Sequence, residues 1–338
     1  MIKVKVTHPY GNWPLIRQTP NSSGIWGGCQ FFVNDDIQEC DYWFVIDDLP
    51  KEEMIVCDSK NTIIITLEFP AIRPNINLKF LKQFNTIFTY SRQINHPNTT
   101  DIIAPFPWHI GVDNTNSETV NNCYKVYDDF KTESIPNKTK LISVISSNKA
   151  FTEGHRKRLQ FVDGLRKHFG ENIDVFGRGI NDFADKWDVI APYKYHLAIE
   201  NSSCNNGISE KLYDSFLGEA FPFYYGCNNV SDYFSSRSFV PIDIDDIDKS
   251  IKIIESSILN QTYEVSVQHI QKSKNLVLDE YNIFNIMSNY CKSNSIVQEN
   301  NNKKLTIKVK PESYFYNAKI QNINNKVQNI KKKLKSFF

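Results

Sequence analysis

The chain has 338 residues, a length that corresponds to about two domains. Hydrophobic residues make up 41% and charged residues 23%, which is typical of soluble globular proteins and excludes a disordered chain. The 39 Lys and Arg residues nearly balance the 38 Asp and Glu residues, so a protein whose main partner is nucleic acid is not expected.

Neither a signal peptide nor a membrane span is expected. The N-terminal residues contain no apolar segment, and no run of about 18 apolar residues occurs in the chain. The seven cysteines are scattered and form no CxxC pair, which indicates reduced thiols rather than a disulfide framework or a zinc site. We therefore expect a cytoplasmic protein.

The first half of the chain alternates short strand-like runs with loops. The predicted elements are strands at 2–6, 42–46, 63–67 and 86–89, and helices at 77–84 and 117–127. The β-branched run at 63–67 is typical of a buried parallel strand and leads directly to Glu68. Residues 92–122 are rich in Asn, Pro and Thr, which predicts a long surface loop that contains Trp108–Gly111.

Strands and helices alternate more regularly in the second half. The predicted strands are 141–146, 173–176, 195–199, 221–225 and 239–242, and the predicted helices are 154–168, 208–219, 248–259 and 263–293. This alternation predicts a parallel sheet with right-handed crossovers. We expect an α/β fold with two facing Rossmann-like domains and ligands bound at the carboxyl ends of the strands, between the domains.

The last segment of the chain combines an apolar stripe with lysines. The stripe has heptad spacing and consists of Ile320, Ile323, Val327, Ile330, Leu334 and Phe337. Six lysines surround it, at positions 319, 326, 331, 332, 333 and 335. The pattern predicts a basic amphipathic helix on an anionic membrane surface, with packing in a homodimer or on the protein itself as alternatives.

The richest segment for chemistry lies between residues 193 and 213. A predicted strand is followed by a polar loop and by a helix for which Ser209 is a good N-cap. Backbone N–H groups at such a helix start attract phosphate. Lys211 in the first turn suits a bound anion, and Glu210 suits sugar hydroxyls, although an ordinary surface Glu–Lys pair is the alternative.

The segment Tyr193-Lys-Tyr-His-Leu-Ala-Ile-Glu-Asn201, followed by Ser209-Glu-Lys-Leu212, resembles the signature of the family 10 fucosyltransferases. In that family the segment reads YKF-x-L-x-FEN, then a loop, then TEK. Further resembling segments are 147–148, 158–160, 221–226, 232–234, 238–240 and 243–246. The resemblance covers about residues 140–290 and implies the GT-B type of two-domain fold and the use of GDP-fucose.

The resemblance also implies roles for particular residues. It implies that Arg158 and Lys211 bind the diphosphate of the donor. Arg156 is an alternative to Arg158 for this role. Asn201 and Glu210 are expected to contact the nucleotide sugar.

Glu68 occupies the position that resembles the family's catalytic base, after a strand and before a turn rich in Asn and Pro. Inverting transfer requires one carboxylate to take the proton of the acceptor hydroxyl. Arg158 and Lys211 would stabilise the leaving diphosphate without a metal. We expect a buried glutamate, which is rare outside functional sites, with an exposed loop residue as the alternative. Relatives carry a donor-contacting Tyr where this chain has Gly207, so the resemblance does not determine which sugar the donor carries.

Other residue types that often form sites are weaker candidates. Asp243-Ile-Asp245 fits a short metal-binding pattern that is common by chance, and no metal or other cofactor is expected. The histidines lack the spacing of metal ligands, so His109 and His196 are expected to be packing or loop residues.

The expected protein has an acceptor-binding domain at 1–137, a donor domain at 138–300 and a C-terminal extension at 301–338. Its expected activity is inverting transfer of L-fucose from GDP-fucose to an acceptor glycan, in α-1,3 linkage on lipopolysaccharide or another surface glycan. It would work as a peripheral protein at the inner membrane surface. The alternatives are another NDP-sugar donor or a non-catalytic carbohydrate-binding protein with the same fold.

Overall fold

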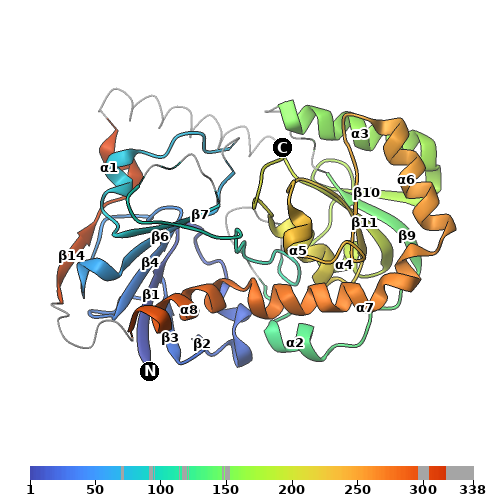
Figure 1. Ribbon diagram of the computed structural model, residues 1–338. Helices are drawn as coiled ribbons and strands as arrows, with labels where there is room; N and C mark the ends of the chain where they lie inside the picture. The colour runs from blue at the N-terminus through green and yellow to red at the C-terminus, as the bar shows by residue number, and fades with distance from the viewer. Residues whose placement is uncertain are drawn as a thin grey trace.

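The computed structural model describes residues 1–69, 72–90, 94, 96–113, 115, 120, 122–146, 148, 153–295 and 304–316. Within them the chain forms two α/β units that lie side by side, each built on its own sheet (Figure 1). This arrangement confirms the expected α/β architecture of two Rossmann-like units. The predicted lysine-rich helix at 320–337 lies outside the described residues.

The first unit contains a seven-stranded sheet of order β2-β3-β1-β4-β6-β7-β8. Its strands are β1 (Ile2–Thr7), β2 (Ile25–Trp26), β3 (Cys29–Val33), β4 (Tyr42–Ile46), β6 (Thr62–Thr66), β7 (Thr86–Thr89) and β8 (Thr99–Asp101). All pairs are parallel except β2 with β3. Every residue of β4 and β6 is buried, because both faces of a central parallel strand are covered.

The second unit contains a parallel sheet of order β10-β9-β11-β12-β13. Its strands are β9 (Lys140–Ile145), β10 (Ile173–Phe176), β11 (Tyr193–Ile199), β12 (Phe221–Tyr225) and β13 (Val240–Pro241). Its helices are α3 (Glu153–Phe169), α4 (Lys186–Ile190), α5 (Glu210–Leu217), α6 (Ile247–Leu259) and α7 (Thr262–Asn275). All the predicted strands of this half are confirmed, whereas α4 was not predicted.

The chain returns to the first unit after α7. Figure 1 shows α7 and α8 (Ile283–Ser295) following one another from the second unit to the first. The predicted continuous helix at 263–293 is wrong, because a π-helical turn, η6 (Leu276–Glu280), separates the two helices. Phe284 and Met287 of α8 are fully buried in the core of the first sheet, although the predicted donor domain included them. A further strand, β14 (Leu305–Val309), pairs antiparallel with β5 (Glu53–Cys57).

Three predictions in the first half need correction. Trp108 and Ile110 are buried in the core of the second unit, so this part of the predicted surface loop is not at the surface. The helix predicted at 117–127 does not form over its described part at 122–126, and α2 (Tyr127–Thr132) follows it instead. Helix α1 (Leu78–Leu81) is shorter than predicted.

Short 3-10 helices occupy several connections, namely η1 (Leu15–Gln18), η2 (Pro20–Ser22), η3 (Ser59–Asn61), η4 (Gly170–Asn172), η5 (Val230–Asp232) and η7 (Glu312–Phe315). None of the described helices has both the length and the apolar character needed to cross a bilayer.

Candidate functional site

A cavity of about 640 Å³ lies where the two units meet. Residues just after the carboxyl ends of β6 and β11 and the first turn of α5 contribute to its walls. A second cavity of about 250 Å³ shares His109, Asn201, Glu210 and Lys211 with the first. This is the position at which ligands bind in open α/β folds.

The structure brings the five predicted site residues to these two adjoining cavities. Glu68, Asn201, Glu210 and Lys211 line the larger cavity. Arg158 lines the smaller one.

Glu200, which the sequence did not single out as a site residue, anchors the start of α5. It is buried, and its carboxylate accepts hydrogen bonds from the backbone N–H of Ser209 at 2.8 Å and from the Ser209 hydroxyl at 2.6 Å. The hydroxyl in turn accepts a hydrogen bond from the N–H of Lys211, as predicted for an N-cap. A side chain larger than glycine at Gly226 would clash with Glu200. The loop and the helix start are thereby fixed relative to β11.

The ammonium group of Lys211 lies between two carboxylates, 3.3 Å from Glu200 and 3.2 Å from Glu210. Although burial opposes its charge, Glu210 and Glu200 raise the pKa of Lys211 above its ordinary value. Burial likewise opposes ionisation of Glu210, but Lys211 and then Lys186 lower the pKa of that carboxyl well below its usual range. Both shifts favour the charged forms, an ammonium at Lys211 and a carboxylate at Glu210.

Lys186, at the start of α4, is a further cation that sequence reasoning missed. It lines the smaller cavity, and its ammonium group lies 2.7 Å from Asp214 and 3.6 Å from Glu210. Its short helix carries no motif, so no local signal marks it. Only the packing of α4 beside α5 brings it to the site.

The structure distinguishes Arg158 from its competitor Arg156. Arg158 is buried on the inner face of α3, and its guanidinium donates to the side-chain oxygen of Asn201 at 2.6 Å. Its Nε atom is buried and has no partner among the described residues. Arg156 is exposed and lines neither cavity. A Cβ atom at Gly154 would clash with the carbonyl oxygen of Asn201, so a glycine is needed for this close approach of α3.

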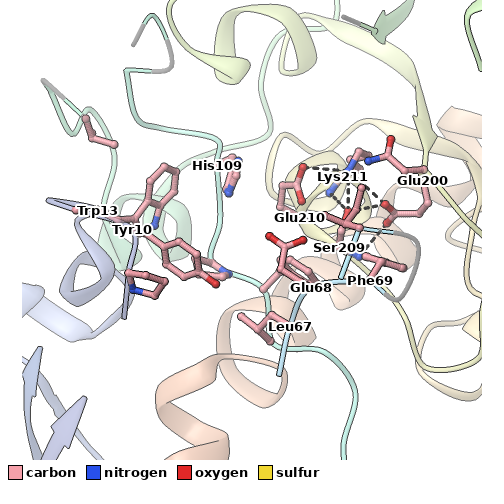
Figure 2. A pocket seen from close by; sticks show the side chains of 17 residues that line it. Tyr10, Trp13, Leu67, Glu68, Phe69, His109, Glu200, Ser209, Glu210 and Lys211 are labelled. Atoms are coloured by element: carbon pink, nitrogen blue, oxygen red, sulfur yellow. Dashed lines mark hydrogen bonds and ion pairs between the residues drawn. The ribbon is translucent and has the colours of Figure 1, made fainter. Parts of the chain in front are cut away.

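Glu68 follows β6 directly and is exposed to the cavity, so the prediction of a buried glutamate is wrong. In Figure 2 its carboxylate points into the open space below Glu210. Within the described part of the chain the carboxylate has no hydrogen-bond or ion-pair partner. Enclosure by the cavity walls, followed by repulsion from Asp47 and Glu210, raises the pKa of Glu68 to about 7.

Asp47, a third residue missed from the sequence, holds the backbone that carries Glu68. Its buried carboxylate accepts hydrogen bonds from the N–H of Leu67 at 2.8 Å and of Glu68 at 3.3 Å. The hydroxyl of Tyr10 donates to the same carboxylate, and Arg73 donates to its carbonyl oxygen at 2.9 Å. These contacts connect residues far apart in sequence, which is why the pattern after the strand at 42–46 did not reveal them.

The histidines differ from expectation in one respect. His109 lines both cavities and is therefore not only a packing residue. Desolvation, with Lys186 and Lys211 nearby, lowers its pKa to about 4, so its ring is neutral at physiological pH. His196 is buried, and its ring forms a hydrogen bond of 2.8 Å with the Ser143 hydroxyl.

No group of three His, Cys, Asp or Glu side chains in the described residues is arranged to hold a metal ion. In the acidic turn before α6, Asp245 forms an ion pair of 2.8 Å with Lys157 of α3.

Comparison with known proteins identifies relatives of the chain. The family model described as glycosyltransferase family 10 (fucosyltransferase), C-terminal part, matches residues 135–311, more than half of the chain. The bovine protein named 4-galactosyl-N-acetylglucosaminide 3-alpha-L-fucosyltransferase 9 is 27% identical over 114 residues, 32% of this chain and 30% of that protein. The Helicobacter pylori protein named alpha-(1,3)-fucosyltransferase FucT is 29% identical over 72 residues, 21% of this chain and 15% of that protein.

The matched part spans less than a third of the length of either relative. A crystal structure of an α1,3-fucosyltransferase with GDP-fucose superposes with a TM-score of 0.50 at 16% identity, covering 89% of this chain and 91% of the other. Two facing Rossmann-like domains are the GT-B type of fold, as the sequence predicted. The chain therefore belongs to glycosyltransferase family 10, the fucosyltransferases.

Proposed function

We propose that this chain is an inverting fucosyltransferase that transfers L-fucose from GDP-fucose to a hydroxyl of an acceptor glycan. Two findings support GDP-fucose as the donor: the membership in the family, and the structural similarity to an α1,3-fucosyltransferase that was crystallised with GDP-fucose. The observation that carries the mechanism is the position of Glu68, an unpartnered carboxylate in the cavity whose opposite wall contains Lys211.

The donor would lie on the second unit. Arg158 and Lys211 are the cations that bind its diphosphate, and the helix dipole at the start of α5 adds to the attraction. Both cations are held by neutral or acidic neighbours in this structure, so the diphosphate would gain partners that are already oriented. The side-chain NH₂ group of Asn201 would donate hydrogen bonds to the hydroxyls of the nucleotide sugar, and the carboxylate of Glu210 would accept hydrogen bonds from them.

The acceptor hydroxyl would bind beside Glu68. As its oxygen forms a bond to the anomeric carbon, the bond from that carbon to the diphosphate breaks on the opposite face, and GDP leaves with the electron pair. Glu68 takes the hydroxyl proton in this step. A pKa of about 7 suits a general base, because the group is ionised near neutral pH and still accepts a proton well. The charge on the leaving group is stabilised by the fixed cations, without a metal.

Gly207, where relatives carry Tyr, is the reason to test whether the donor is another NDP-sugar. A Cβ atom here would crowd Cys204, Phe69 and Tyr90, so no larger side chain fits without movement. The cavity wall at this position is formed by Phe69 of the first unit. A donor screen that compares GDP-fucose with GDP-mannose and UDP-sugars distinguishes this alternative, and binding of glycans without any turnover would favour a non-catalytic protein.

Replacing the base tests the mechanism. We expect Glu68→Gln to lower kcat for transfer by about 10²- to 10⁴-fold, because it removes the proton acceptor and leaves the donor contacts in place. Transfer from labelled GDP-fucose on a glycan array gives the activity, and calorimetry gives the donor Kd, which should change less than about twofold. Glu264→Gln, at an exposed ion pair with Lys194, is the control. Full activity of Glu68→Gln would refute this assignment.

The two predicted phosphate ligands can be tested by binding alone. Arg158→Ala and Lys211→Ala should each weaken GDP binding by about tenfold or more, since each loses a charge-assisted contact. Arg156→Ala is a matched control on the exposed face of the same helix and should bind GDP normally. Equal effects of Arg156→Ala and Arg158→Ala would contradict the assignment.

The pH dependence of kcat/KM for transfer should follow the protonation of Glu68. Below pH 7 the carboxyl is protonated and cannot accept a proton, so kcat/KM should fall on the acidic side with a midpoint near 7. The charged groups that face Glu68 are Asp47, Glu210, Arg73 and Lys211. Asp47→Asn removes one negative charge, so the midpoint should move to lower pH.

Asparagine suits this substitution, because it keeps an acceptor oxygen and tolerates the positive φ of 58° at Asp47. Asp48→Asn is the control, because the neighbouring carboxylate instead accepts from the N–H groups of Leu49 and Glu312. A midpoint that does not move in Asp47→Asn would argue against Glu68 as the titrating group.

We also propose that residues 320–337 bind an anionic membrane surface on the cytoplasmic side, where lipid-linked or lipopolysaccharide acceptors would be available. The heptad stripe and the six lysines support this proposal. Deletion of residues 318–338 should abolish sedimentation with vesicles that contain phosphatidylglycerol and should leave transfer to a soluble glycan intact. Replacement of the six lysines with Gln should have the same effect, and unchanged vesicle binding would disprove the role.

A further inference from the structure

The part of the larger cavity that belongs to the first unit is mainly apolar and aromatic. Its ring-bearing residues include Pro9, Tyr10, Trp13, Phe106, Pro107 and His109. Figure 2 shows Trp13, Tyr10 and His109 on one side of the cavity, with Glu210 and Lys211 on the other and Glu68 between the two groups. A ligand on this wall would therefore lie beside Glu68, across from the charged residues of α5.

Trp13 and His109 form the centre of this wall. Their ring centroids are 4.6 Å apart, and the ring planes are inclined by 46°. The indole Nε1 atom of Trp13 is buried and has no hydrogen-bond partner among the described residues. A buried N–H donor is rarely left unpaired, so an oxygen atom of a ligand at this position would accept a hydrogen bond from the indole N–H.

The wall is held rigidly from both units. Arg17, in the 3-10 helix that follows Trp13, donates to the carbonyl oxygens of Trp108 at 2.5 Å and Ile110 at 2.9 Å, on either side of His109. From the second unit, Asp214 accepts hydrogen bonds from the N–H groups of His109 and Ile110 at 3.0 and 3.2 Å. The backbone that carries His109 is thus fixed before any ligand binds, which lowers the entropic cost of binding.

The charges at the wall limit the chemistry of its ligand. The pKa of His109 is lowered to about 4, so the ring is neutral, and the Tyr10 hydroxyl is already bonded to Asp47. Glu68 and Glu210 face the same space and would repel an anion. Phosphates and acidic sugars are therefore unsuitable. An uncharged sugar ring has an apolar C–H face for aromatic rings and oxygens for the indole N–H.

We propose that Trp13 and His109 form the platform on which the sugar ring of the acceptor stacks, with Trp13 Nε1 donating to one of its oxygens, so that a hydroxyl of that ring reaches Glu68. This inference rests on the proposed transferase function and adds the residues that select a neutral acceptor sugar.

The test measures acceptor and donor separately in the full-length protein. The acceptor probe is 4-galactosyl-N-acetylglucosamine, taken from the name of the bovine relative. Trp13→Ala should raise the KM for this disaccharide by about tenfold or more, because it removes the stacking face. The Kd for GDP-fucose and its slow hydrolysis without acceptor should remain as in the wild type. Trp13→Phe keeps a ring but loses the N–H donor, and should give an intermediate KM.

Trp26→Phe is the matched control. Trp26 belongs to the same unit, its Nε1 atom donates to Asn285 at 3.1 Å, and it lines neither cavity. Fluorescence adds a direct readout, since the disaccharide should quench tryptophan emission in the wild type and in Trp26→Phe, and much less in Trp13→Phe.

The outcomes separate the two proposals. Normal GDP-fucose binding together with an unchanged acceptor KM in Trp13→Ala would overturn the platform alone. The platform would also be overturned if a protein that binds GDP-fucose gave neither turnover nor quenching with any neutral glycan of the array. A wild-type protein that binds no GDP-fucose would instead overturn the proposed function, and the platform with it.

Discussion

The buried carboxylate of Asp214 connects the parts of the site. It lies on α5 and accepts hydrogen bonds from the backbone of His109 and Ile110, which come from the first half of the chain. Its second oxygen binds the ammonium group of Lys186 at 2.7 Å. A single buried anion thus fixes the aromatic wall, the helix that carries Glu210 and Lys211, and a cation of the smaller cavity. Such a carboxylate is stable in the interior only because each of its oxygens has partners.

The site alternates positive and negative groups at short range. Lys211 lies between Glu200 and Glu210, and Lys186 lies between Glu210 and Asp214. Because the cations already have acidic partners, their charges are balanced before a ligand arrives. Glu68 differs from the other carboxylates of the site, since it forms no ion pair with any described residue and the nearby Asp47 and Glu210 raise its pKa. This contrast agrees with the proposed role of Glu68 as the proton acceptor.

The C-terminal part of the described chain supports the backbone around Glu68. Glu312 forms an ion pair with Arg73 and accepts a hydrogen bond from the N–H of Asn77. Arg73 in turn donates to Asp47, whose carboxylate holds the backbone of Glu68. The return of the chain through α8 and β14 therefore completes the first unit and supports the turn that presents Glu68.

The sequence by itself determined the class of fold and much of the site. The continuous β-branched run at 63–67 identified β6, and segments rich in apolar residues identified β4, β11 and β12, because a strand buried on both faces needs no partner information to be recognised. Ser209, Glu210 and Lys211 were identifiable because a helix start is a local structure. The strands β2 and β8 were missed, because they are too brief or too polar for periodicity to reveal them, and the five-residue strands β3, β5 and β14 were missed as well.

Only the tertiary structure decided which groups surround the predicted residues. Asp47, Lys186 and Trp13 stand in unremarkable local sequence, and each acquires its role from chain segments that are distant in sequence or packed beside it. The hydrogen bonds from Arg17 to Trp108 and from His109 to Asp214 span 91 and 105 residues. The exposure of Glu68 and its raised pKa likewise come from the cavity walls and from Asp47 and Glu210. Local patterns encode backbone conformation, whereas electrostatic environment depends on which distant groups folding brings together.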